Sequence, residues 1–308
     1  MKKSLLTILV VGLSILMSAC GERVPVTITL NYDAGSVIGT KVTLTDHSIN
    51  KPRIYKKTAN TIDVVFEKVI PGQYVLTVEH EDYFPFTETE IMVQTSMPAF
   101  IVNLYKNGPA TFNISTNIGS ANGAIIVIKN DVGQTQQITL QDKSVTFPHL
   151  ISGILSIEIT HDNYFAYTSS GISAISLVGI TDIMLSRKGQ ANCFVFYDKG
   201  YYSDGWRYLE AAPAHTEFEL NWYFSQINSE ELDFNGFTDW YLPSRSELNL
   251  MFQNLKMNKM GDFRNMWYWS STGLDDKITH AWLIAFDNGV NYPGEKRIMY
   301  QARAIRKF

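Results

Sequence analysis

Residues 66–87, FEKVIPGQYVLTVEHEDYFPFT, recur 81 positions further along the chain as residues 147–168, FPHLISGILSIEITHDNYFAYT. The two stretches are identical at seven positions, and other positions exchange similar residues. The identical pairs are Phe66/Phe147, Ile70/Ile151, Gly72/Gly153, His80/His161, Tyr83/Tyr164, Phe84/Phe165 and Thr87/Thr168. This period is longer than that of solenoid repeats, so we expect each copy to close its own core. The sequence therefore predicts a tandem domain duplication.

Short runs of alternating apolar and polar residues surround the first copy, which is typical of half-buried strands. They lie at 24–32, 41–45, 61–66, 74–78, 90–93 and 99–104, with turn residues such as Pro71-Gly72 between them. No helical pattern of comparable strength occurs before about residue 215. We therefore expect a mainly β N-terminal half made of two tandem Ig-like β-sandwiches, at 24–107 and 108–188, each with about six or seven short strands.

The repeated stretch also resembles known surface modules. Residues 69–85, VIPGQYVLTVEHEDYFP, are similar to the carboxypeptidase-regulatory-like and PEGA-type β-sandwich modules, although the Pro-Glu-Gly-Ala string of the PEGA family is absent. The resemblance covers both repeats, and it implies that they act as spacers. For His80 and His161, one in each repeat, a structural hydrogen bond at a strand end is expected in preference to a metal site, because a metal needs several ligands together.

The N-terminus has the layout of a signal peptide. Lys2 and Lys3 precede an apolar run at 5–17, and this run is too short for the roughly 20 residues that a membrane-spanning helix needs. Met17-Ser18-Ala19-Cys20 resembles the lipobox of bacterial lipoproteins, with Met where that motif usually has Leu. The resemblance implies cleavage after residue 19 and lipidation of Cys20, followed by a tether at 20–23. Ordinary secretion with an incidental cysteine is the alternative.

Placement in the envelope follows from the same segment. A lipid on Cys20 implies a membrane partner, and Gly21 replaces the Asp that retains some lipoproteins at the inner membrane, so the outer membrane or cell surface is preferred. The formal net charge is −4, with 26 basic and 30 acidic residues, which gives no indication of nucleic-acid binding. Cys193, the second of two cysteines, is expected to be a buried inert thiol. No cofactor or metal is expected.

The composition changes after about residue 188, because all six tryptophans lie at position 206 or later. Three blocks stand out in this part of the chain: 196–213 with Gly205-Trp206-Arg207, 235–248 with Asp239-Trp240 and Leu242-Pro243-Ser244-Arg245, and a final set with Tyr268-Trp269-Ser270-Ser271, Ala281-Trp282 and Ala302-Arg303-Ala304-Ile305-Arg306. In this order they resemble the DUF1566 family, also called the Lcl C-terminal domain. The resemblance implies an α+β C-type-lectin-like domain at 189–308, in a family that includes a surface adhesin that binds glycosaminoglycans.

Residues of these blocks also have structural explanations of their own. Ser244 and Glu247 form a capping-box pattern, flanked by Pro243 and Leu248, and Leu248, Met251, Phe252 and Leu255 give the following helix one apolar face. The run from Ala281 to Phe286 is apolar on both strand faces, which indicates a central strand. For at least one of Arg303 and Arg306, an ion pair with Asp239 or Glu247 is favoured over a basic ligand patch. We therefore assign structural roles to Asp239, Trp240, Pro243, Ser244, Glu247, Trp269, Trp282 and Arg303.

Ligand contact is expected from aromatic and basic residues on loops and strand ends. The candidates are Trp267, Tyr268, Tyr292, Lys296 and Arg297. In 267–269 the side chains alternate, so at least one ring is expected to leave the core, with full burial of all three as the alternative. Only residues 214–234 separate the first two blocks, so the first helix of the family is expected to be trimmed, which reduces the surface available for a ligand.

No catalytic residue is assigned, because nucleophile, phosphate-loop and metal-protease motifs are missing from the sequence. The favoured function is a non-catalytic, adhesin-like binding lipoprotein whose C-terminal head contacts a glycan or protein while the sandwiches act as spacer. A structural or docking component of an envelope assembly is the alternative, and an enzyme of unknown type is a lesser one. A homo-oligomer is compatible with either reading.

Overall fold

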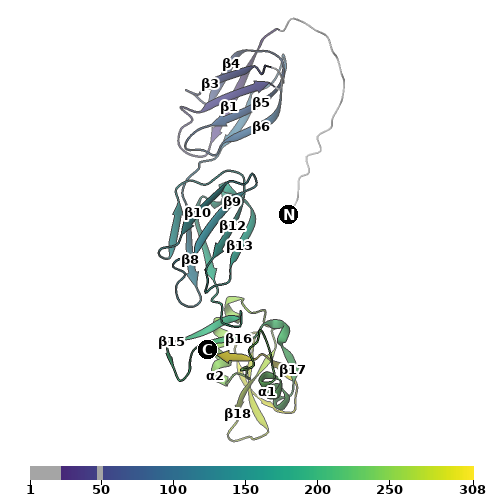
Figure 1. The fold of residues 1–308 in the computed structure, drawn as a ribbon. Coiled ribbons are helices and arrows are strands. Elements are labelled where there is room, and N and C mark those ends of the chain that lie inside the picture. Colours follow the sequence, from purple (N-terminus) through teal and green to yellow (C-terminus); the bar gives the residue numbers. More distant parts are fainter. Residues whose placement is uncertain (1–21, 47–50) are drawn as a thin grey trace. The chain divides into compact units, whose positions relative to one another are not determined.

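The computed structural model describes residues 22–46 and 51–308, and it is mostly β (Figure 1). Two compact units divide between Gly108 and Pro109. The predicted signal peptide, Cys20 and Gly21 lie outside the described residues. Within the described part of the chain, none of the helices has both the length and the apolar character needed to cross a bilayer.

The described residues of the first unit form a sandwich of seven strands in two sheets. One sheet has the order β4-β1-β7 and the other β3-β2-β5-β6. Most of the apolar side chains point between the sheets, as with Val26, Ile28 and Leu30 of the first strand. The strands are β1 (Val24–Tyr32), β2 (Lys41–Asp46), β3 (Ile54–Thr58), β4 (Asp63–Val69), β5 (Gly72–Glu79), β6 (Phe86–Val93) and β7 (Phe100–Leu104).

The second sandwich opens the second unit and repeats the same topology. Its sheets have the orders β11-β8-β14 and β10-β9-β12-β13, and the parallel pairing of β8 with β14 corresponds to that of β1 with β7. The strands are β8 (Ala110–Thr116), β9 (Ile125–Asn130), β10 (Thr135–Thr139), β11 (Ser144–Phe147), β12 (Ile154–Thr160), β13 (Tyr167–Ser173) and β14 (Gly179–Leu185). The predicted pair of β-sandwiches is confirmed.

The repeated histidine and tyrosine form the same corner in both sandwiches. In the first, His80 Nδ1 accepts from the backbone N–H of Asp82 at 3.0 Å, and Nε2 donates to the carbonyl of Ile38 at 3.2 Å. The Tyr83 ring lies 5.1 Å from the His80 ring, and its hydroxyl donates to the Ala34 carbonyl. The structural hydrogen bond expected for this histidine is thus present.

The second sandwich has the equivalent contacts. His161 Nδ1 accepts from Asn163 N–H at 3.0 Å, and its Nε2 lies 3.2 Å from the Asn122 carbonyl. Tyr164 packs on the His161 ring and donates its hydroxyl to the Ile118 carbonyl at 2.6 Å. Both ring nitrogens are used in each copy, so the sequence identity between the repeats reflects one conserved turn geometry.

The C-terminal head, which follows β14 in the second unit, mixes helices and short strands, as predicted for an α+β domain. Its sheets have the orders β15-β16-β22 and β17-β21-β18-β19-β20. The strands are β15 (Phe194–Ser203), β16 (Trp206–Ala211), β17 (Phe218–Leu220), β18 (Trp267–Gly273), β19 (His280–Ala285), β20 (Asn291–Glu295), β21 (Tyr300–Ala302) and β22 (Ile305–Lys307). The helices are α1 (Trp222–Glu230) and α2 (Arg245–Asn254).

Helix α2 begins as the sequence predicts. The Ser244 hydroxyl accepts from Glu247 N–H, and the Glu247 carboxylate accepts from Ser244 N–H at 2.8 Å, so both bonds of the capping box are present. Burial raises the pKa of Glu247, but the hydrogen bonds from Ser244 and Tyr241 outweigh it and hold the pKa below its ordinary value. Leu248, Met251 and Phe252 pack into the core.

A partly buried ion network joins the last strand to the rest of the head. Arg306 Nε lies 2.7 Å from Asp239 Oδ1, and its Nη1 lies 2.5 Å from Oε1 of the fully buried Glu210. The ion pair expected between the C-terminal arginines and Asp239 is therefore confirmed for Arg306. Glu210 also accepts from Ala191 N–H, and a Cβ at Gly189 would lie 2.0 Å from its Oε2, so the segment entering the head packs directly on this carboxylate.

Candidate functional site

The five predicted ligand residues separate into different environments. Trp267 on β18 is half-buried and Tyr292 on β20 is 56% exposed, and their ring centroids are 5.8 Å apart. The strand pairing sets Trp267 opposite Ala285 and Tyr292 opposite Leu283, so both rings lie on the same face of the five-stranded sheet. The structure therefore brings these two residues together.

Tyr268 requires a correction, because it lies in the core and is 0% exposed. Its ring packs 4.3 Å from Phe286, and its hydroxyl donates to Glu217 at 2.7 Å. Alternation along β18 turns Tyr268 toward α2, where Phe286 and other apolar residues enclose it. Tyr268 is not accessible to a ligand in this fold, whereas its neighbour Trp267 on the other face is partly accessible.

The two basic candidates also differ. Lys296 Nζ lies 4.0 Å above the ring of Trp222, at the start of α1, in a cation–π contact. Arg297 is 81% exposed and pairs with Glu295 at 2.7 Å. Sequence reasoning missed Trp222 as the partner of Lys296, because the two residues are far apart in the chain and meet only through the sheet.

The residues assigned structural roles lie within or beside the core. Trp240 donates to the Phe237 carbonyl and Trp269 to the Leu220 carbonyl, and both are buried, as is Pro243. Trp282 is half-buried under the guanidinium of Arg245, which lies 3.6 Å from its ring. Arg303 is 1% exposed and pairs with Glu217 at 2.6 Å, a partner that the sequence did not indicate.

Cys193 precedes β15, is buried, and forms no disulfide within the residues that the structure describes. Burial raises the pKa of its thiol to about 12, so the sulfur stays protonated and unreactive at neutral pH. The described residues contain no group of three or more His, Cys, Asp or Glu side chains that could hold a metal ion.

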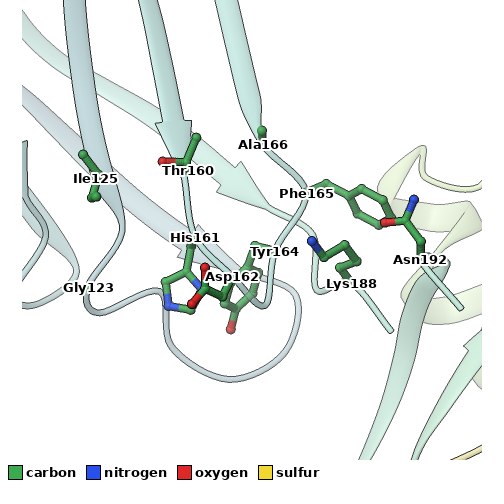
Figure 2. Close-up of a pocket in the computed structure, with 10 residues that line it drawn as sticks. All are labelled: Gly123, Ile125, Thr160, His161, Asp162, Tyr164, Phe165, Ala166, Lys188 and Asn192. Carbon is green, nitrogen blue, oxygen red and sulfur yellow. The ribbon is translucent and has the colours of Figure 1, made fainter. Parts of the chain in front are cut away.

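A second candidate site is a groove of about 590 Å³ where the second sandwich meets the segment that leads into the head (Figure 2). Side chains of the two parts are in contact. Asn117 donates to the Val195 carbonyl at 2.9 Å, and the ring centroids of Phe165 and Phe194 lie 4.8 Å apart. The lining residues are Gly123, Ile125, Thr160, His161, Asp162, Tyr164, Phe165, Ala166, Lys188 and Asn192.

Three polar groups border this groove without a protein partner. The Lys188 ammonium, the Asp162 carboxylate and the Asn192 amide form no hydrogen bond or ion pair within the part of the chain that the structure describes. Asn192 has a φ of 57°, a left-handed conformation that asparagine tolerates better than most residues. These groups are therefore free to bind a ligand.

The first sandwich has a smaller hollow of 370 Å³ at the equivalent place. Its lining residues Gly39, Lys41, Glu79, His80 and Glu81 correspond to Gly123, Ile125, Thr160, His161 and Asp162. The groove in the second sandwich is larger because Phe165, Lys188 and Asn192 also line it. Sequence reasoning missed this site, although the repeat itself was the signal that could have located it.

In the comparisons with known proteins, a family model matches one part of the chain. No curated protein matches. Solved structures with weak similarity include the TIE protein of Bacillus anthracis, at 13% identity and a TM-score of 0.25, over 53% of this chain and 33% of that chain. The minor pilin of Streptococcus agalactiae is similar at 9% identity and a TM-score of 0.32, over 54% of this chain and 97% of that chain. The shaft pilin of Lactobacillus rhamnosus GG is similar at 11% identity and a TM-score of 0.22, over 55% of this chain and 99% of that chain. Residues 201–306 match the family model of the Lcl C-terminal domain.

Proposed function

We propose that this chain is a lipid-anchored, non-catalytic binding protein of the bacterial cell surface, whose head contacts a glycan. The observation that carries the proposal is the pair of accessible rings, Trp267 and Tyr292, on one face of a domain that matches the Lcl C-terminal family. The duplicated sandwiches serve as a spacer between the Cys20 lipid and the head.

The chemistry of this face suits a sugar with anionic groups. Aromatic rings stack on the apolar faces of sugar rings while hydroxyl groups stay hydrated. Lys296, held over Trp222, offers a cation at the edge of the same sheet, and Arg297 adds a second exposed basic group. A sulfated polysaccharide supplies both ring faces and negative charge.

The test is retention of residues 22–308 on immobilised heparin over a salt gradient. We expect retention at low salt that weakens as salt screens the charges, and earlier elution for Tyr292→Ala and Lys296→Gln. Tyr201→Ala is the matched control, since Tyr201 is also highly exposed but lies on β15. Absence of retention at low salt, or an equal effect of the control, would contradict the proposal.

The lipid anchor is tested separately in cells. A chain with Cys20→Ser should fail to incorporate radiolabelled palmitate and should leave the membrane fraction, while the unmodified chain incorporates the label. Labelling that persists in the Cys20→Ser chain would show that the anchor lies elsewhere.

A second candidate function, docking to another envelope protein, is favoured by helix α1. Tyr223, Phe224 and Ile227 are each about half exposed along this nine-residue helix and form an apolar surface. A protein partner would cover this surface, so crosslinking in envelope extracts should enrich one partner with the unmodified chain and not with Phe224→Asp. Heparin retention would be unchanged by that substitution.

A further inference from the structure

A small pocket adjoins the groove of Figure 2. It has a volume of about 160 Å³ and shares two lining residues with the groove, Phe165 and Asn192, so the two hollows meet at this pair. The rest of its wall comes from the head: Cys193, Phe194, Ala211, Ala212, Pro213, Ala214, Leu255, Gly261, Asp262 and Arg303. Together the hollows form an open groove with a narrow extension.

The small pocket has a mainly apolar wall, and it is also lined by Arg303, which has two unsatisfied nitrogen donors. Three alanines, Pro213, Leu255 and two phenylalanines line it together with Asp262, and burial keeps the Cys193 thiol protonated. Arg303 Nη1 donates to the Gly261 carbonyl, but the buried Nε and Nη2 have no hydrogen-bond partner within the described residues, although Nη2 lies 2.6 Å from Glu217 Oε1 in an ion pair. A buried N–H without an acceptor is costly, so an acceptor on a ligand would be stabilised here.

The charge of the pocket favours a neutral acceptor. Glu217, which lies 2.6 Å from Arg303 and is itself 4% exposed, already neutralises the guanidinium. A carboxylate or sulfate would add a buried negative charge beside that carboxylate, which is unfavourable without a second cation. A carbonyl oxygen accepts the Nε–H without this cost.

The volumes of the two hollows indicate a ligand with a large part and a small part. Whole small-molecule sites occupy about 300–1,000 Å³, so the 590 Å³ groove has room for one or two sugar rings. The 160 Å³ pocket is below this range and can take only a substituent of a few atoms. The occupant therefore has a hydroxyl-rich body and a short side group that ends in a methyl and carries a carbonyl.

We propose that this groove binds an N-acetylated sugar, with the acetamido group in the small pocket and the sugar ring in the groove. The acetamido carbonyl accepts from Arg303 Nε, and the methyl packs on Ala211, Ala212 and Ala214. Phe165 offers a ring face to the sugar, and Lys188, Asn192 and Asp162 hydrogen-bond its hydroxyls. The inference rests on the proposed glycan-binding function but assigns a site distinct from the Trp267–Tyr292 face.

The experiment compares two disaccharides that differ in the acetamido groups. Residues 22–308 are titrated with N,N′-diacetylchitobiose and with cellobiose, by calorimetry and by saturation-transfer NMR on the acetamido methyl. We expect at least a tenfold tighter binding of the acetylated sugar and saturation transfer to its methyl. Equal affinity for the two sugars, or binding of neither, overturns the inference.

Two variants locate the site. Ala214→Leu fills the small pocket and should abolish the preference for the acetylated sugar, while Lys188→Gln should weaken binding about tenfold. Lys41→Gln, in the equivalent hollow of the first sandwich, is the matched control and should change nothing. Near-UV circular dichroism checks that Ala214→Leu folds, and Lys188→Gln tests the site independently of that variant. Unchanged binding in Lys188→Gln places the sugar elsewhere and overturns the assignment.

Heparin retention separates the two proposals. If the chain is retained on heparin but shows no preference for the acetylated disaccharide, the glycan-binding function stands and this site fails. If it prefers the acetylated disaccharide but is not retained on heparin, this site stands and the Trp267–Tyr292 face fails.

Discussion

The sandwiches and the head are both rich in β-structure, but they bury different chemistry. Among the described residues, the buried polar side chains of the two sandwiches are Thr40 and Asn130, both uncharged. The head buries Glu210, Arg303 and Arg306. The described parts of the sandwiches therefore bury no charged side chain, whereas the head buries ion pairs between distant segments.

Strand length explains this difference. Most sandwich strands have five to nine residues, enough for two to four inward side chains each. In the head, β17, β21 and β22 have three residues each, so they bury little apolar area themselves. Arg306 and Glu210 supply contacts that such short strands cannot supply through apolar side chains.

The largest effect is expected from Arg306→Met, which leaves Glu210 buried without its partner. We expect a loss of about 3–5 kcal/mol in the free energy of unfolding of the head. All six tryptophans lie at position 206 or later, so tryptophan fluorescence during denaturation reports the head specifically. Arg297→Met, at an exposed pair, should cost less than about 1 kcal/mol. Similar losses for the two variants would show that burial of the ion pair is unimportant.

An intermediate effect is expected at the repeated tyrosine. Tyr83→Phe and Tyr164→Phe each remove a hydroxyl that donates to a backbone carbonyl, and each should cost about 1–3 kcal/mol. Far-UV circular dichroism should detect both losses. Tyr83→Phe should leave the tryptophan transition unchanged, because Tyr83 belongs to the first compact unit. Each variant's unfolding constant is compared with that of the unmodified chain. A tenfold difference between the two resulting ratios would contradict the equivalence of the two His–Tyr corners.

The smallest effect is expected from acid. The Arg207 guanidinium lowers the pKa of Asp198, Arg306 lowers that of Asp239, and the pKa of Glu247 is also below its ordinary value. The unfolded chain takes up these protons first as pH falls, so the head should lose stability below the ordinary values of 3.8 and 4.5. The midpoint of denaturation, followed by tryptophan fluorescence, should be lower at pH 3.5 than at pH 5. The substitution Asp198→Asn should reduce this difference.

Glu210 has the opposite effect on the stability of the head, and it acts at higher pH than the three carboxylates above. Burial raises its pKa above the ordinary 4.5, against the opposing hydrogen bond from Arg306, so the folded head binds this proton more readily than the unfolded chain. Stability from this group therefore increases as pH falls toward 4.5. A midpoint that decreases monotonically from pH 7 to pH 3.5 would show that Glu210 stays ionised throughout.

Residues with a local pattern were predictable. The alternation at 24–32 and 74–78 gave β1 and β5, and Ser244 with Glu247 gave the start of α2. Strand β3 was missed because its five residues IYKKT are mostly exposed and have no buried alternation. Tyr268 was misjudged because alternation along β18 turns its ring into the core beside α2, while Trp267 lies on the other, partly accessible face.

The amino-acid sequence by itself determined the duplication, the two sandwiches and the helix cap, because each depends on residues within one strand, one turn or one repeat. Only the tertiary structure decided the pairing of Arg306 with Glu210, the meeting of Trp267 with Tyr292, and the groove that Lys188 and Asn192 complete. These features join segments separated by many residues, and their energies depend on burial and distance, which a linear pattern does not contain.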